Sequence, residues 1–234
     1  MKIKKAMILA AGLGSRLRPI TKKTPKPLIK INEKNLLERS IVLLKNHGIN
    51  EITINVHYLS EQIELYLKNN NFDLKINISN EKDEILDTGG GILKGTSSFG
   101  SEPFIVLNPD TVWTKNYSNE LEILEKRYHQ YKNCILLLVH KKLSFDNTFS
   151  GDFSLDSKNC ISKKDKNDYI YTGMQILNRS IFSNKKMEKF SINTVWDKLI
   201  SLNKLKGHIS ENIFYHVNTQ KMFNKINSLK IIDL

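Results

Sequence analysis

The chain is poor in several residue types whose abundance marks particular classes of protein. Of its 234 residues, only 2 are cysteine, 5 are proline and 11 are glycine. So few cysteines exclude a disulfide scaffold, and so little proline and glycine exclude collagen-like and low-complexity proteins. Apolar residues make up 40% of the chain and charged residues 26%. This composition is typical of a folded domain with a sizeable core.

Long apolar runs are also missing. The run from Cys134 to Val139 is far shorter than the roughly 20 residues that a membrane-spanning helix needs. Near the amino terminus, Gly12 ends the apolar stretch 6–11, and Arg16 and Arg18 follow at once. A signal sequence needs a longer apolar stretch without arginines directly after it. We therefore expect a cytoplasmic protein with free thiols and no membrane partner.

Arginine is scarce in a chain that is otherwise strongly basic. The net charge is +12, but lysine supplies 31 of the 36 basic residues and arginine only 5. The lysines are scattered over the whole chain together with 25 asparagines, which AT-rich coding DNA produces without selection for binding. Net charge alone argues weakly for nucleic-acid binding, so we expect no nucleic-acid partner. Two of the arginines, Arg16 and Arg18, share one short loop, which is more informative.

Apolar periodicity predicts alternating strands and helices through the first 140 residues. This order favours a mostly parallel central sheet with helices on both faces, an α/β fold of three layers. The expected strands cover residues 5–10, 51–56, 74–79, 103–107 and 134–139, and the expected helices cover 35–46, 60–68, 87–97 and 117–132.

After residue 145 the pattern changes to shorter segments. They indicate an antiparallel excursion built onto the same sheet, followed by a closing helix. No linker rich in glycine, serine or proline interrupts residues 1–234, which predicts a single domain. The expected strands here are 151–155, 169–177 and 212–217, with a helix at 194–203.

The loop after the first strand carries features of a phosphate-binding turn. Gly12 and Gly14 allow a positive φ and a close approach of the backbone to a ligand. Backbone amides at such a turn can hold phosphate, and Arg16 and Arg18 add charged donors. The loop lacks the lysine of a P-loop, and Leu17 replaces the third glycine of a dinucleotide fingerprint. An ordinary turn after a strand explains the two glycines equally well.

A lysine between two prolines follows this loop. Proline fixes φ, so Pro25 and Pro27 leave Lys26 little backbone freedom. A rigid lysine a few residues beyond an anion-binding turn suits phosphate recognition. The alternative is a solvated lysine in a stiff turn.

These two segments together resemble the signature of the sugar-1-phosphate nucleotidyltransferases. The resemblance covers about residues 4–226 and implies a Rossmann-like nucleotidyltransferase fold. It implies a nucleotide-binding half at 1–115 and a sugar-phosphate-binding half at 116–234. The triple glycine within Asp87–Ile92 is most similar to that of the N-acetylmuramate 1-phosphate uridylyltransferases of peptidoglycan recycling. The matching positions of the signature are Leu9, Ala10, Ala11, Gly12, Gly14, Arg16, Pro19, Thr21, Pro25, Lys26, Pro27 and Leu28.

The resemblance implies that a sugar 1-phosphate attacks a nucleoside triphosphate and releases pyrophosphate. Such chemistry needs positioning and charge stabilisation rather than a protein nucleophile. Arg16 is implied to hold the triphosphate, Lys26 to bridge the α-phosphate and the incoming phosphate, and Asp110 to bind Mg²⁺. The implied nucleotide contacts are Leu9, Ala10, Ala11, Gly12, Gly14, Asn80, Thr88, Gly89, Gly90 and Asn108. The implied sugar-phosphate contacts are Gly151, Asp152, Thr172 and Gly173.

One position departs from the family pattern. The family usually takes a second metal ligand from a late Asp-Val-Gly-Thr segment, where this chain has His216 for the aspartate and Asn218 for the glycine. Neutral imidazole is a poor ligand for Mg²⁺. The favoured interpretation is that Mg²⁺ rests on Asp110, phosphates and water. Alternatively, Asp152 or Asp197 substitutes, or the enzyme is impaired or prefers Mn²⁺.

Several functions stay open at this stage. UTP with N-acetylmuramic acid 1-phosphate is the leading pair of substrates. GTP with mannose 1-phosphate, or CTP with phosphocholine, belongs to the same class. A catalytically weak protein that binds nucleotide sugars, suggested by His216, and a nucleic-acid-binding module, suggested by charge alone, are the other hypotheses. The sequence leaves the oligomeric state open.

Overall fold

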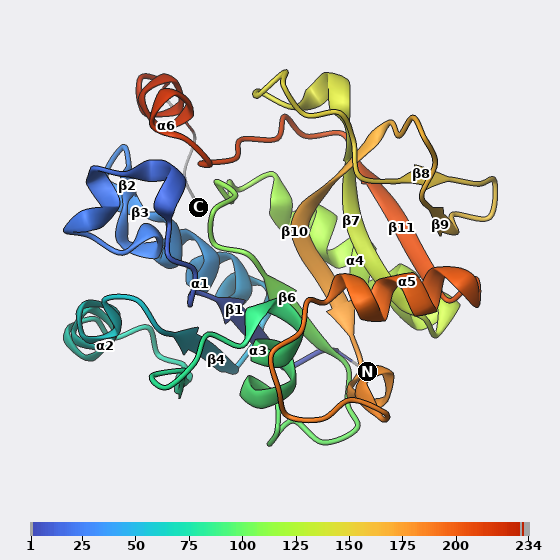
Figure 1. Ribbon diagram of the computed structural model, residues 1–234, viewed down its shortest axis with the longest axis horizontal. Coiled ribbons are helices and arrows are strands. Elements are labelled where there is room, and N and C mark those ends of the chain that lie inside the picture. The colour runs from blue at the N-terminus through green and yellow to red at the C-terminus, as the bar shows by residue number, and fades with distance from the viewer. Residues whose placement is uncertain (1, 230, 232–234) are drawn as a thin grey trace.

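A mixed sheet of seven strands forms the centre of the computed structural model, which describes residues 2–229 and 231 (Figure 1). The strand order is β11-β7-β10-β6-β1-β4-β5. β10 runs antiparallel to both of its neighbours, and all other neighbouring pairs are parallel. The expected mostly parallel sheet is therefore confirmed. The strands are β1 (Lys5–Leu9), β4 (Glu51–Val56), β5 (Lys75–Asn80), β6 (Phe104–Leu107), β7 (Cys134–His140), β10 (Tyr169–Leu177) and β11 (Leu205–Ser210).

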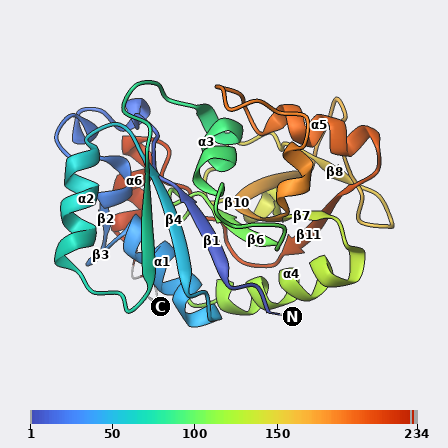
Figure 2. The same ribbon diagram turned by 90° about the horizontal axis from the view of Figure 1, so that it is seen from below.

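Helices cover both faces of this sheet, as Figure 2 shows. One face carries α1 (Leu36–His47), α2 (Ser60–Asn69) and α4 (Tyr117–Tyr131), and the other carries α3 (Asp87–Gly95) and α5 (Asn193–Ser201). Two short hairpin pairs lie outside the sheet, β2 (Lys30–Ile31) with β3 (Lys34–Asn35) and β8 (Ser154–Leu155) with β9 (Ile161–Ser162). The remaining helices are α6 (Gln220–Asn227) and the 3₁₀ turns Ser15–Leu17, Ile20–Lys22, Lys26–Leu28, Lys141–Leu143 and Arg179–Phe182. Within the described residues, no helix is long and apolar enough to cross a membrane.

The sequence explains the first helix well. The side chain of Asn35 accepts a hydrogen bond from the Glu38 amide and begins α1, and Gly48 ends it with a φ of 96°. Leu37 and Ile41 recur at helical spacing and are fully buried against the sheet. Burying this stripe against the parallel strands is the main source of the helix's stability.

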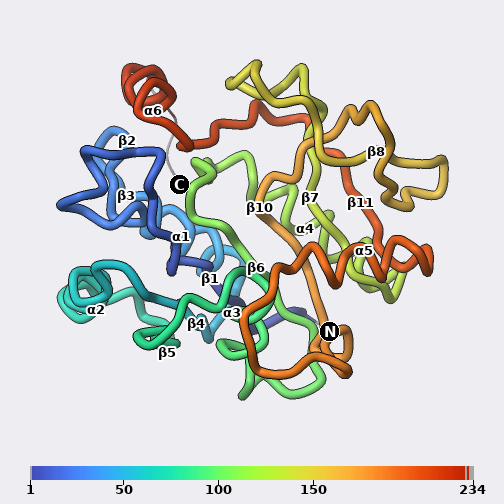
Figure 3. Tube along the Cα trace, in the orientation of Figure 1, coloured from blue at the N-terminus to red at the C-terminus, as the bar shows by residue number. Residues whose placement is uncertain are grey.

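The second half of the chain differs from the expectation in three places. Of the expected strand 151–155, only β8 (Ser154–Leu155) forms, and it pairs with β9 outside the central sheet. Residues 212–217 do not form a strand of the sheet. They form isolated bridges instead, His216 with Thr111 and Phe214 with Ser144. Figure 3 shows this segment running from the end of β11 to α6, past the loops that follow β6 and β7. One of the two edge strands of the sheet is β11, which the sequence did not predict because Lys206 and Gly207 weaken its apolar pattern.

A buried carboxylate joins the amino terminus to α1 and α4. Glu125 accepts hydrogen bonds from the Ile3 amide at 2.6 Å and from His47. Burial alone would raise the pKa of Glu125, but the bonds from His47 and Ile3 outweigh burial and hold this pKa below its ordinary value of 4.5. The carboxylate therefore stabilises the fold above about pH 4.5, and this stabilisation is lost as the pH falls through the folded-state pKa.

Replacing Glu125 by glutamine is expected to reduce the free energy of unfolding by about 1–3 kcal/mol at neutral pH, because buried donors lose a charged acceptor. The loss should be smaller at a pH acid enough to protonate the wild-type carboxylate, that is, below its lowered folded-state pKa. Urea unfolding of both proteins at the two pH values measures this difference. An equal loss at both values would contradict the assigned role of the charge.

Candidate active site

The main cavity lies where the parallel strands end. Because β1, β4 and β6 run in the same direction, their carboxyl ends meet at one edge of the sheet, where α/β proteins bind ligands. The cavity there has a volume of about 390 Å³. Its lining includes most of the nucleotide contacts implied by the sequence, namely Leu9, Ala10, Ala11, Gly12, Gly14, Thr88 and Asn108, together with Arg16, Lys26 and Asp110.

The first loop has the backbone geometry of an anion-binding turn at one of its two glycines. Gly14 has a φ of 62°, and its carbonyl accepts a hydrogen bond from the Thr21 hydroxyl at 2.8 Å. Gly12 does not have a positive φ, but a Cβ added there would meet nothing within 4 Å. None of the described residues accepts a hydrogen bond from the amides of Gly12, Leu13 or Gly14. These amides are therefore available to an anion in the cavity.

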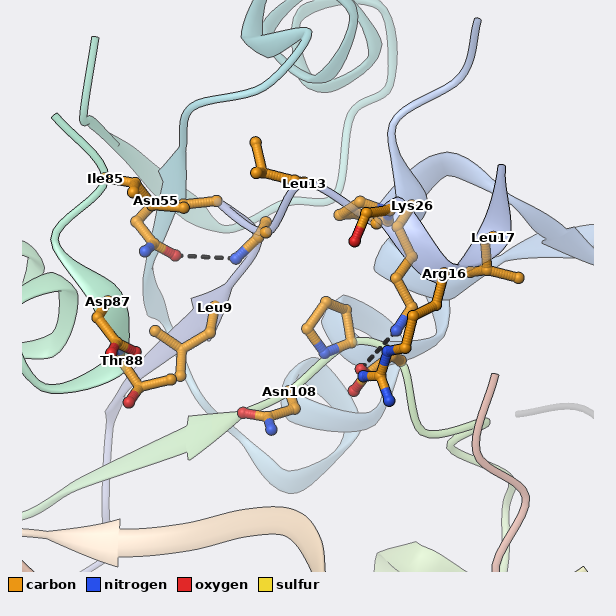
Figure 4. Close-up of a pocket in the computed structure, with 18 of the residues that line it drawn as sticks. Leu9, Leu13, Arg16, Leu17, Lys26, Asn55, Ile85, Asp87, Thr88 and Asn108 are labelled. Carbon is orange, nitrogen blue, oxygen red and sulfur yellow. Dashed lines mark hydrogen bonds and ion pairs between the residues drawn. The ribbon is translucent and has the colours of Figure 1, made fainter. Parts of the chain in front are cut away.

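Two basic side chains reach the same end of this cavity (Figure 4). Pro25 and Pro27 are buried and hold Lys26 in a short 3₁₀ turn, as the sequence predicts. The Lys26 ammonium lies 2.6 Å from Oδ2 of Asp110. Arg16 is exposed and makes no ion pair or hydrogen bond with another described residue. Its guanidinium is free to bind an anionic ligand beside Lys26.

Asp110 follows β6 and lies between two basic groups. Its Oδ2 is close to the Lys26 ammonium and lies 3.0 Å from Nε2 of His216. Burial alone would raise the pKa of Asp110, but the charges of Lys26 and His216 outweigh it and hold this pKa well below its usual range. The carboxylate is therefore ionised at neutral pH. Its Oδ1 accepts no hydrogen bond from the described residues.

His216 is held beside Asp110 by aromatic rings and by the backbone. Its ring stacks on Phe214 with 16° between the planes and contacts Phe149 with ring centres 5.7 Å apart. The Val217 amide donates to the carbonyl of Asp110 at 2.8 Å. The Nδ1 atom of His216 is buried without a hydrogen-bond partner among the described residues. A metal-binding histidine normally donates its second ring N–H to an acceptor, and His216 lacks that support.

A second, smaller cavity of about 160 Å³ adjoins the first and shares Asn108 and Asp110 with it. Three of the four implied sugar-phosphate contacts, Asp152, Thr172 and Gly173, line it. Gly151 does not line it. Its φ is 94°, and a Cβ there would lie 2.5 Å from the carbonyl oxygen of Asn167, so this glycine is needed for chain packing.

Three expected nucleotide contacts do not line the main cavity. The side chain of Asn80 turns away to donate to Glu64 at 2.9 Å. The amides of Gly89 and Gly90 donate to the carbonyl of Phe190 at 2.9 and 3.1 Å, so they are not available to a ligand. These glycines lie inside α3, where they leave room for the ring of Phe190 and the backbone of residues 188–190.

Alanine at position 89 is expected to destabilise the fold by about 1–3 kcal/mol, because its Cβ would overlap the ring of Phe190. Gly12→Ala provides the matched control, since its Cβ would meet nothing within 4 Å. Thermal unfolding of the two variants measures the difference. A Gly89→Ala protein as stable as the wild type would show that this glycine does not serve packing.

Sequence reasoning missed several residues that line the main cavity. Asn55, at the end of β4, lines it together with Glu81, and Leu13 and Ile85 line it as well. The only sign of Asn55 in the sequence was a polar residue near the end of an expected strand, which does not by itself indicate a cavity. No group of three or more histidine, cysteine, aspartate or glutamate side chains that could hold a metal ion exists among residues 2–229 and 231.

Comparison with known proteins agrees with this geometry. Residues 5–144 match the family model described as nucleotidyl transferase, and this match covers more than half of the chain. The chain therefore belongs to the nucleotidyl transferase family. The predicted family, enzyme class and fold are confirmed.

Two curated relatives act on sugar 1-phosphates. The chain is 28% identical over 221 residues to the N-acetylmuramate alpha-1-phosphate uridylyltransferase of Caulobacter vibrioides. This alignment covers 91% of the chain and 90% of the relative. The chain is also 34% identical over 192 residues to the D-glycero-alpha-D-manno-heptose 1-phosphate guanylyltransferase of Campylobacter jejuni. This alignment covers 80% of the chain and 81% of the relative. The fold is similar to that of the inositol-1-phosphate CTP transferase from T. maritima, with a TM-score of 0.76, 17% identity and coverage of 97% and 98%.

Proposed function

We propose that this nucleotidyltransferase joins UTP and N-acetylmuramic acid 1-phosphate to form a nucleotide sugar and pyrophosphate, a reaction of peptidoglycan recycling. The observation that carries the proposal is the meeting of the two cavities at Asp110, with Lys26 at 2.6 Å from its carboxylate. The choice of substrates rests on the uridylyltransferase that aligns with nearly the whole chain.

In the proposed reaction, the main cavity holds the nucleotide and the smaller cavity holds the sugar phosphate. An oxygen of the sugar phosphate attacks the α-phosphorus. The bond from that phosphorus to the oxygen bridging to the β-phosphorus breaks, and pyrophosphate leaves. Lys26 leaves Asp110 to hold the α-phosphate and the incoming phosphate, and Arg16 holds the phosphates that depart. Both contributions are electrostatic and are strongest where negative charge accumulates.

A divalent cation fits the residues present. Asp110 offers an ionised carboxylate whose Oδ1 accepts no hydrogen bond from the described residues. One carboxylate plus substrate phosphates and water is a usual environment for Mg²⁺. When bound, Mg²⁺ would neutralise phosphate charge. The Nδ1 atom of His216 has no acceptor among the described residues, which does not suit a metal ligand. In the proposed reaction, His216 therefore donates to Asp110 and does not bind the ion. The proposed site of action is the cytoplasm, where thiols such as its two free cysteines stay reduced.

Pyrophosphate release by the purified protein with Mg²⁺ tests the proposal. UTP, GTP and CTP should each be tried with N-acetylmuramic acid 1-phosphate, mannose 1-phosphate, a heptose 1-phosphate and phosphocholine. The expected result is release with UTP and N-acetylmuramic acid 1-phosphate. Release with GTP and the heptose 1-phosphate alone would support the second candidate, which the 34% identity to a guanylyltransferase favours. No release in any combination, with Mn²⁺ also tried, would refute the enzymatic proposal.

A further inference from the structure

A buried polar pair at the main cavity has no part in the reaction described above. Asn55 at the end of β4 is 3% exposed, and Glu81 directly after β5 is 1% exposed. Both residues line the cavity. Polar groups buried so deeply are costly unless they are fully hydrogen-bonded, so their partners indicate what they do.

The pair links two separate segments of the chain. Oδ1 of Asn55 accepts from the Ala10 amide at 2.8 Å, and its Nδ2 donates to Oε1 of Glu81 at 2.7 Å. The other carboxylate oxygen, Oε2, accepts from the Leu86 amide at 2.8 Å. We call Asn55 and Glu81 the brace. It connects the start of the phosphate-binding loop to the segment 85–88, which forms another part of the cavity wall.

The brace lies at the end of the cavity away from the basic side chains. In Figure 4, Asn55, Asp87 and Thr88 lie on one side, and Lys26 and Arg16 lie on the other. A nucleotide whose triphosphate lies at the basic side chains would extend its base toward the brace. The brace therefore sets the distance between the two segments that enclose the base.

The third glycine of the triple is explained by the same pair. A Cβ on Gly91 would lie 2.9 Å from Nδ2 of Asn55 and 2.9 Å from Oε1 of Glu81. Contacts under 3.0 Å require something to move, so any side chain here would push against the brace. Gly91 thus serves the brace, whereas Gly89 and Gly90 make room for residues 188–190.

We propose that Asn55 and Glu81 are positioning residues that fix the base-binding end of the nucleotide site and thereby set both its affinity and its choice of base. Both oxygens of Glu81 accept hydrogen bonds from protein groups, so the carboxylate acts through the segment 85–88 and not on the base itself. This proposal rests on the proposed function only in assuming that the cavity binds a nucleoside triphosphate.

Exchanging the amide and the carboxylate between positions 55 and 81 tests the proposal, because each of the three hydrogen bonds has a known donor and acceptor. In Asn55→Asp, two carboxylates would face each other and repel. In Glu81→Gln, the new amide group can accept from Asn55 but then presents N–H to the Leu86 N–H. In the double variant, the carboxylate at position 55 would accept from the Ala10 amide and from the side-chain amide at position 81. The amide oxygen at position 81 would accept from the Leu86 amide, so all three bonds could form with the middle one reversed.

Calorimetric dissociation constants for UTP, GTP and CTP with Mg²⁺, measured without a sugar phosphate, test the proposal. Each single variant is expected to bind the preferred nucleotide about tenfold more weakly and to discriminate less among the three bases. The double variant is expected to recover both properties. Gly91→Ala should behave like the single variants, although it removes neither polar group.

Glu120→Gln is the matched control, because Glu120 is also a buried carboxylate with several protein donors but lies outside both cavities. It should lower the unfolding temperature and leave nucleotide affinity unchanged. Single variants that bind like the wild type would overturn the proposal. So would a double variant as weak as the weaker single variant, since the charge of Glu81 would then act on the base. A wild-type protein that binds none of the three nucleotides would instead refute the proposed function, and this proposal with it.

Discussion

Replacing Lys26 by alanine is expected to lower kcat by about 10²–10³-fold and to leave the protein folded. Buried prolines on both sides restrict the backbone of Lys26, and its ammonium group lies 2.6 Å from Asp110, which lines both cavities. A donor fixed in advance at the place where charge develops stabilises the transition state more than the bound substrate. The loss should therefore appear in kcat, with a smaller change in the KM for the nucleotide.

Steady-state pyrophosphate release at varied nucleotide concentration measures both constants. Lys22→Ala is the appropriate control, because Lys22 is an exposed lysine in the neighbouring 3₁₀ turn and lines neither cavity. It should retain wild-type kinetics. If Lys26→Ala kept more than a tenth of the wild-type kcat, Lys26 would not be part of the catalytic machinery.

Asp110→Asn is expected to lower activity by at least about 10³-fold, because a cation's neutralisation of phosphate charge contributes several kcal/mol. Asparagine preserves the shape of the side chain but removes the ionised group that Lys26 and His216 contact. The remaining activity should no longer increase with Mg²⁺ concentration. Mn²⁺ binding in the presence of nucleotide, followed by electron paramagnetic resonance, should weaken in parallel.

The matched comparison is His216→Gln, which keeps a side chain that can donate to Asp110. Because His216 acts on the carboxylate and not on the substrate, its loss should cost about 10–100-fold rather than more. If the imidazole itself bound the cation, His216→Gln would lose more activity than Asp110→Asn. Full activity of Asp110→Asn would remove this carboxylate from the mechanism.

The sequence predicted most of the sheet because its strands are local features. Residues 51–56 alternate, and 134–139 are continuously apolar, so each can be recognised without knowledge of its neighbours. β11 has Lys206, Gly207 and His208 in its middle and is a strand because β7 pairs with it. Residues 212–217 show the opposite case, because Phe214 packs with strand residues and Val217 with helix residues while the segment itself forms only isolated bridges. Tertiary pairing decides both segments, and a single sequence does not display it.

The residues of the candidate site also fall into two groups, those that local motifs reveal and those that only long-range packing reveals. Gly14, Lys26 and Asp110 stood out because each lies in a short motif whose geometry is local. Asn55 lies 45 residues from Ala10 and 26 from Glu81, so its role becomes visible only when β1 and β4 are paired. Gly89 and Gly90 of α3 were predicted to be ligand contacts, whereas they pack against the ring of Phe190 and the backbone of a segment about 100 residues later. Long-range packing imposes these requirements, and local spacing does not reveal them.

The most direct measurement follows the α-phosphate. UTP labelled with ³²P at the α-position is incubated with the protein, Mg²⁺ and N-acetylmuramic acid 1-phosphate, and the products are separated. Attack on the α-phosphorus predicts that all transferred label appears in the nucleotide sugar, with one unlabelled pyrophosphate released for each molecule formed. Label in free UMP, or release of inorganic phosphate with label in UDP, would show hydrolysis or transfer of the γ-phosphate and would contradict the proposed reaction.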